Sequence, residues 1–252
     1  MKQTSKRHKA HGGTLVELMV ALGILGLVTA GIFSQLDAAT QRISAEQVKV
    51  DNFDEARDFV DQFFRDINQI GYPNGHMVSF LPTPLTVAAN LTAAQADSRV
   101  AIGLVKISAN SIWFEGDING SGIVQSVQYQ INGSGTCTLC FQRSAVPKVA
   151  ASPLTGQSAA DWGTEVNDLV TPTIFTYFDA NGNQLTPSPS ADIVSNPAML
   201  AQVKTIHISL TIQNSAVMDP KTHQPIQTSF EGEVSLNNCS LAAVGYNPMS
   251  CQ

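Results

Sequence analysis

The four cysteines carry the most reactive side chains in the sequence, and their spacing is the first chemical signal to interpret. Cys137 and Cys140 have the separation found in redox and zinc sites, but no second such pair and no nearby histidine accompanies them. All four cysteines follow a long apolar segment, so export of that region favours two disulfides. We favour the pairs Cys137–Cys140 and Cys239–Cys251, since each pair is close in sequence; a metal site of four thiolates is the alternative.

Other polar clusters match catalytic or metal-binding patterns poorly. Residues 117–122 have the spacing that begins a calcium loop, yet Gln128 stands where the closing glutamate is required, so we predict a turn. The five histidines show no ligand spacing, and no nucleophile, phosphate-binding or dinucleotide motif is present. We therefore expect a protein that is not an enzyme and that uses no cofactor, metal ion or small-molecule substrate.

Charge is distributed unevenly along the chain. Residues 1–12 contain four bases and no acid, whereas the rest of the chain contains ten bases and twenty acids. Only 13% of all residues are charged, and small polar residues are abundant, which suits an extracytoplasmic β-rich domain. An acidic body argues against direct binding of nucleic acid, because that binding depends on Lys and Arg side chains that neutralise phosphates.

An apolar segment follows the basic stretch and has the length of a membrane-spanning helix. Leu18–Leu36 comprises 19 residues without a charge. Bases before it and acids after it place the N-terminus in the cytoplasm and the body outside. Glu17 stands at its start, where a carboxylate costs several kcal/mol unless a partner compensates it. A conventional secretory signal cleaved near residues 28–30 is the alternative; it yields a soluble exported binding protein and leaves Glu17 unexplained.

The residues from Gly12 to Glu17 resemble the processing signal of type IV prepilins and pseudopilins. This resemblance implies that prepilin peptidase cleaves between Gly12 and Gly13 and methylates Gly13, although that family usually has Phe or Met at this position. It also implies that Glu17 meets the N-terminal ammonium of a neighbouring subunit, and removing one member of such a buried pair costs about 3–5 kcal/mol. The implied partners are other pilins or minor pilins, prepilin peptidase and the inner membrane.

The helical pattern continues past the membrane edge. Apolar residues recur every three or four positions and acidic residues occupy the opposite side, with Asp61 and Arg65 spaced for an ion pair. Gly71 and Pro73 end the helix. Segment 63–73 resembles the end of this helix in PilW-type minor pilins, and J-type pseudopilins have a looser version. The apolar stripe comprises Phe53, Ala56, Val60, Phe64, Ile67 and Ile70; the acidic stripe comprises Asp51, Asp54, Glu55, Asp58 and Asp61.

The remainder of the sequence predicts β-strands separated by turns and loops. Alternation of apolar and polar residues is cleanest at 205–212 and 230–236, which we expect to pair antiparallel around a loop at 213–225. Segments rich in Ser, Pro, Ala and Asn are expected to be long surface loops, at 143–170 and 184–201. Further strands are predicted at 100–107, 111–115 and 123–131.

These features predict an α+β, pilin-like fold in which a long N-terminal α-helix, half in the membrane and half amphipathic, packs on an antiparallel β-sheet. We expect a cleaved leader at 1–12, a transmembrane and filament-core helix at 13–36, its amphipathic continuation at 37–72 and an extracytoplasmic β-rich domain at 73–252. The expected function is that of a minor pilin, a structural subunit of a type IV pilus. It would be held in the inner membrane by one helix, with its body in the periplasm, and then built into a pilus at the cell surface. A J-type pseudopilin of a type II secretion system is the alternative.

Overall fold

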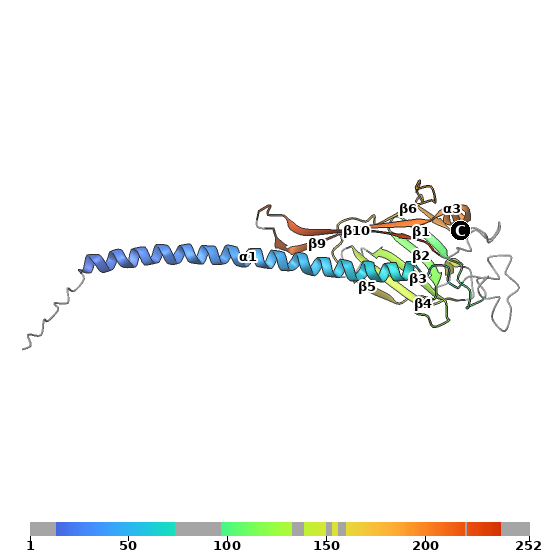
Figure 1. Ribbon diagram of the computed structural model, residues 1–252, viewed down its shortest axis with the longest axis horizontal. Coiled ribbons are helices and arrows are strands. Elements are labelled where there is room, and N and C mark those ends of the chain that lie inside the picture. Colours follow the sequence, from blue (N-terminus) through green and yellow to red (C-terminus); the bar gives the residue numbers. More distant parts are fainter. Residues whose placement is uncertain are drawn as a thin grey trace, which may run out of the picture.

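One long helix, α1 (Leu15–Ile67), dominates the computed structural model (Figure 1). Its 53 residues span about 80 Å at roughly 1.5 Å per residue. The first half projects from the body as an uncovered rod, whereas the second half lies against the strands. The amphipathic continuation was predicted to reach residue 72, but the helix ends at Ile67 and residues 68–71 form turns. The structure describes residues 14–73, 97–132, 139–149, 153–155, 160–219 and 221–237.

Within these ranges the body consists of two antiparallel sheets beside the helix, so the predicted fold class is confirmed with two sheets in place of one. The first sheet has the strand order β5-β4-β3-β2-β1-β8, and the second has the order β10-β9-β6-β7. The strands of the first sheet are β1 (Leu104–Ser108), β2 (Ser111–Gly116), β3 (Gln125–Asn132), β4 (Cys140–Pro147), β5 (Trp162–Val166) and β8 (Ser190–Asp192). Those of the second are β6 (Phe175–Phe178), β7 (Gln184–Leu185), β9 (Thr205–Met218) and β10 (Pro225–Ser235), with the short helices η2 (Pro153–Thr155) and α3 (Pro197–Gln202) in the connections.

The hairpin of β9 and β10 confirms the predicted strand pair and corrects its length. Leu210 lies opposite Phe230, and the alternate apolar residues of β9 up to Ile212 are buried, as predicted. The predicted loop at 213–225 is wrong, because β9 continues to Met218 and β10 begins at Pro225. This outer part of the hairpin carries polar cross-strand contacts such as the 2.8 Å hydrogen bond from Gln227 to Gln213, which apolar alternation does not reveal.

Two segments predicted as surface loops contain regular structure. Segment 143–170 includes most of β4 and all of β5, and segment 184–201 includes β7, β8 and most of α3. In β4, Gln142 and Ser144 pair with residues of β3 through a backbone ladder. Small polar side chains on such strands give no alternation of apolar and polar residues, so a local sequence pattern does not reveal them. Pairing with neighbouring strands stabilises these strands instead.

The buried face of α1 is wider than the predicted apolar stripe. Ala56, Val60 and Ile67 are buried as predicted, but so are Phe59 and Phe63, which the predicted stripe omitted. The helix is packed by both sheets, and a second sheet extends the buried arc around its circumference. The rings of Phe59 and Phe63 pack against aromatic rings of both sheets, Tyr129, Phe141 and Phe175.

Two members of the predicted stripe lie at the margin of the buried face instead. Phe53 is 44% exposed and packs against Phe230 of β10, with ring centroids 5.9 Å apart. Phe64 is partly buried and lies over Gly232, where an added Cβ would come within 2.5 Å of its ring. The backbone of β10 therefore approaches the helix closely because position 232 has no side chain.

Asp66 is a buried carboxylate in the last turn of α1, only 1% exposed. Its Oδ2 accepts hydrogen bonds from the Tyr129 hydroxyl at 2.7 Å and from Arg143 Nε at 2.8 Å, and Arg143 Nη2 also lies at 2.8 Å. Its Oδ1 accepts from Gln62 Nε2 at 2.7 Å. Tyr129 on β3 and Arg143 on β4 stand opposite each other in the sheet. One carboxylate thus joins the helix to two adjacent strands, and burial together with this carboxylate raises the pKa of Tyr129.

A second buried ion pair fixes the end of the first sheet. Lys148 Nζ lies 3.1 Å from Glu115 Oε2 and donates to the Val100 carbonyl at 2.6 Å. Both side chains are fully shielded from solvent. Burial lowers the pKa of Lys148, and the adjacent Glu115 opposes that shift. Because Glu115 Oε2 also accepts from Ile102 N at 3.2 Å, the pair ties β2 to the segment leading into β1.

We predict that Asp66→Ala lowers the free energy of unfolding by about 3–5 kcal/mol, because it leaves a largely buried guanidinium and a buried hydroxyl without their acceptor. The matched control is Asp61→Ala, an exposed acid on the same helix, with an effect of at most about 0.5 kcal/mol. Urea unfolding of the full chain in detergent, followed by tryptophan fluorescence, measures both. Similar small effects of the two substitutions would contradict a structural role for Asp66.

Candidate processing and assembly site

The first turn of α1 places Glu17 at the start of an uncovered apolar helix. Thr14 is the N-cap: its backbone is extended and its hydroxyl accepts a hydrogen bond from Glu17 N at 3.4 Å. Thr14 and Glu17 have the spacing of a capping box, and an acid in the first turn also interacts favourably with the helix dipole. The predicted cleavage residues Gly12 and Gly13 come directly before this cap and lie outside the described residues.

The Glu17 side chain is available to an external partner. It is exposed, and among the described residues no base forms an ion pair with it and no group donates a hydrogen bond to its carboxylate. The apolar side chains that follow it up to Leu36 are also exposed. By length and composition this part of α1 is able to cross a membrane, and none of it is buried against the body. The surface around Glu17 is therefore one that requires lipid or other helices to cover it.

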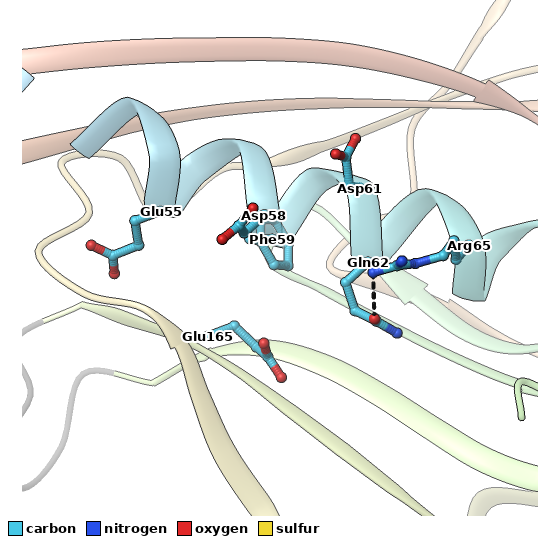
Figure 2. Close-up of a pocket in the computed structure, with 7 residues that line it drawn as sticks. All are labelled: Glu55, Asp58, Phe59, Asp61, Gln62, Arg65 and Glu165. Atoms are coloured by element: carbon cyan, nitrogen blue, oxygen red, sulfur yellow. Dashed lines mark hydrogen bonds between the residues drawn. The ribbon is translucent and has the colours of Figure 1, made fainter. Parts of the chain in front are cut away.

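A polar groove lies between α1 and β5 in the described body (Figure 2). It has a volume of about 570 Å³. Glu165 on β5 faces the helix across it, and the guanidinium of Arg65 donates to Gln62 Oε1 at 3.0 Å on the other wall. The lining residues are Glu55, Asp58, Phe59, Asp61, Gln62, Arg65 and Glu165. Four carboxylates and one guanidinium make the groove acidic, and its lining includes no serine, cysteine or histidine to act as a nucleophile or base.

The predicted acidic stripe along this wall is solvent-exposed except at Glu55, which is half-buried, and the predicted ion pair is wrong. Asp61 pairs with Arg57 at 3.9 Å, not with Arg65, whose guanidinium is used by Gln62. Both spacings are allowed on a helix, and the nearby amide of Gln62 decides between them. Glu55 Oε1 accepts from Asn167 N at 3.0 Å, which adds a contact between helix and body that the sequence did not predict.

Of the predicted disulfide cysteines, the structure describes Cys140. It is buried at the start of β4 and is not a free thiol. Cys137, Cys239 and Cys251 lie outside the described residues, so the two predicted pairings stay predictions. At the sequence that begins like a calcium loop, Asp117 accepts hydrogen bonds from Ser121 N and Gly122 N, as in the predicted turn. The described ranges contain no group of three or more His, Cys, Asp or Glu residues arranged to hold a metal ion.

We predict that stability depends on pH through Glu165. Burial raises the pKa of this carboxyl above its ordinary 4.5, with Arg143 partly opposing the shift. As pH rises from 4.5, the unfolded chain releases its proton first, so the free energy of unfolding falls until the folded carboxyl also ionises. Glu165→Gln should remove that decrease in urea unfolding of the full chain at a series of pH values. Parallel curves for the wild type and the variant would show that Glu165 does not titrate differently on folding.

Comparison with known families matches one motif at this end of the chain. Residues 7–33 match the prokaryotic N-terminal methylation motif, which includes Gly12, Gly13, Thr14 and Glu17. No curated protein and no solved structure matches the chain. The chain thus carries a prokaryotic N-terminal methylation motif at the start of an uncovered apolar helix, and it has a pilin-like α+β fold in which two antiparallel sheets pack on the second half of that helix.

Proposed function

We propose that the chain is a minor-pilin-like structural subunit of a type IV pilus, anchored in the inner membrane before assembly. One observation carries this proposal: Glu17 lies in the first turn of an uncovered apolar helix, inside the methylation motif. A lone carboxylate at this depth is costly in lipid and becomes favourable only beside a positive charge. An assembled bundle of such helices supplies that charge from another subunit's N-terminus.

In this proposal prepilin peptidase cleaves between Gly12 and Gly13 and methylates the new amine. Cleavage removes the basic residues of the leader and leaves one ammonium at the tip of the helix. Glu17 becomes the fifth residue of the mature chain. The ammonium of one subunit then compensates Glu17 of the next, and the pair sets the register between helices because either charge left alone in the bundle is destabilising.

The body has the properties that such a subunit requires. Asp66 joins α1 to β3 and β4, and Phe59 and Phe63 pack into the core, so the second half of the helix and the sheets form one unit. A load applied to the rod is thereby transmitted to the body. The acidic groove and the loops of the body remain exposed on such a subunit and are available to other proteins.

The assignment to a subfamily rests on a shorter resemblance. Segment 63–73 favours the PilW type of minor pilin, and in this segment Asp66 is the residue that joins helix and sheet. A J-type pseudopilin of a type II secretion system has the same anchor and the same assembly physics, and is the alternative that the looser form of this segment supports. Purification of native fibres distinguishes the two, since a pilus subunit is recovered from surface fibres and a pseudopilus subunit is recovered with the secretion apparatus.

We predict that the mature protein begins at Gly13. Gly12→Val should block processing, because a bulky residue replaces the glycine at the peptidase site, and it should leave a precursor with an intact leader. The matched control, Gly13→Ala, should still be cleaved. N-terminal sequencing and intact mass of the membrane protein measure both. A mature chain that begins near Gly31 would instead support a conventional signal and a soluble exported protein.

We also predict that Glu17→Gln is processed normally but enters fibres at least tenfold less efficiently than the wild type. Glutamine fits the capping position of the first turn and removes only the charge, so the loss reports the ion pair and not the helix cap. Asp37→Asn, which changes an exposed acid just past the apolar segment, should leave incorporation unchanged. Quantitative blotting of sheared fibres gives the ratio. Equal incorporation of Glu17→Gln and wild type would remove the assembly role of Glu17.

A further inference from the structure

Apolar side chains continue along one side of α1 from the last residue of the membrane-spanning segment into the part of the helix beyond it. Leu36, Ile43 and Val50 are each seven residues apart and are 56%, 70% and 53% exposed. Seven residues are nearly two turns of an α-helix, so these three side chains form one line along the rod. We refer to Leu36, Ile43 and Val50 as the outer line.

The outer line lies on the side of the helix that faces away from the body. Ala45 and Asn52, two residues after Ile43 and Val50, are buried. Two residues correspond to about 200° around an α-helix, so the buried positions and the outer line are on opposite sides. The β9–β10 hairpin runs beside this part of α1 (Figure 1), and it leaves the outer line uncovered.

Lipid does not explain the outer line. Ile43 and Val50 lie 7 and 14 residues past Leu36, or about 10 and 21 Å along the helix, and charged side chains surround them. A row of apolar residues every seventh position suits contact with another helix, not with a bilayer. Of the intervening positions, Ala39 is small, Glu46 is paired with Lys49 at 3.1 Å, and Phe53 packs against Phe230 of the body, so the outer line itself carries the contact.

Charged residues beside the outer line indicate which partner helix fits there. In a parallel, in-register pair of identical helices that meet along the outer line, the residue just before a line position lies next to the residue five positions later on the partner helix. Lys49 comes just before Val50, so it lies next to Asp54 of the other copy. Asp54 is exposed, whereas Lys49 is half-buried and lies 3.1 Å from Glu46 of its own helix, so Lys49 exchanges Glu46 for the partner's Asp54 when the two helices meet. Two copies anchored by the same apolar segment also lie at the same membrane depth, which places equivalent residues side by side. A second copy of this chain therefore satisfies both the apolar line and the charges.

We propose that two copies of this chain pair in the membrane, parallel and in register, through Leu36, Ile43 and Val50, before either enters a fibre. This proposal rests on the membrane anchoring in the proposed function and adds a defined partner and surface to it. The pairing covers Ile43 and Val50, which stand in water between the membrane and the body. It requires no movement of the sheets, because the body lies on the opposite side of α1.

Cysteine cross-linking of the full chain in native membranes tests this pairing. Ile43→Cys and Val50→Cys should each give dimers with a short bis-maleimide, at least fivefold above Ser44→Cys and Asp51→Cys, which are exposed positions one residue away and about 100° around the helix. The wild type sets the background from the native cysteines. Equal yields at all four positions, or no dimer above background, would overturn the proposal.

Two differently tagged copies in one cell identify the partner. A cross-linked product that carries both tags supports a second copy, whereas a product that contains a different membrane protein overturns that assignment. Lys49→Asp should lower the dimer yield about twofold, and Lys49→Asp combined with Asp54→Lys should restore it. Failure of the double variant to restore the yield would reject the in-register arrangement.

The same experiment in cells that lack prepilin peptidase separates this inference from the proposed function. The uncleaved chain keeps its apolar segment, so the pairing should persist there although no fibre is made. A chain that is cleaved after Gly12 and enters fibres but gives no dimer keeps the proposed function and loses this inference. A chain that gives dimers but is never cleaved after Gly12 keeps this inference and loses the proposed function.

Discussion

The junction at Asp66 is the interaction on which the rest of this structure depends. The rod that extends from the body is about half of α1, so any rotation at the junction is amplified at the end that carries Glu17. The carboxylate of Asp66 is satisfied by Tyr129, Arg143 and Gln62, and these contacts fix both the position and the rotation of the last helical turns. A hydrophobic contact alone would permit sliding, whereas a buried carboxylate with directed donors has one favourable geometry.

The single helix is built for two environments. Its first half exposes apolar side chains on all sides, and its second half buries an aromatic face while an acidic stripe faces water. The helix continues without a break from its apolar first half into its second half. The packing of Phe59 and Phe63 against the body therefore also sets the direction in which each residue nearer the N-terminus of α1 faces. This is why the direction in which Ile43 and Val50 face follows from the packing of the body.

The sequence was most informative where one local pattern is decisive. The apolar segment up to Leu36 and the alternation of β9 up to Ile212 follow from short-range periodicity, and the structure has them as predicted. It was least informative where contacts are distant. Asp66 looks like one more acid on an acidic helix, because its partners are 63 and 77 residues away. The polar strands β4 and β5 were missed for the same reason, since they are stabilised by ladders with neighbours and not by their own apolar period.

The acidic residues that follow the outer line along α1 limit the length of helix over which two copies can associate. Past Val50 the outward side of α1 carries Asp54, Asp58 and Asp61, all exposed, so two parallel copies in register bring like charges together at the height of the body. Lys49 can compensate the first of these acids and Arg57 lies 3.9 Å from the third, so Asp58 is the acid that repels its equivalent in the other copy. Association through Leu36, Ile43 and Val50 is therefore confined to the part of the rod that precedes the two bodies. A contact of that limited length is weak enough to be exchanged when a subunit leaves its membrane partner for the continuous helical packing of a fibre.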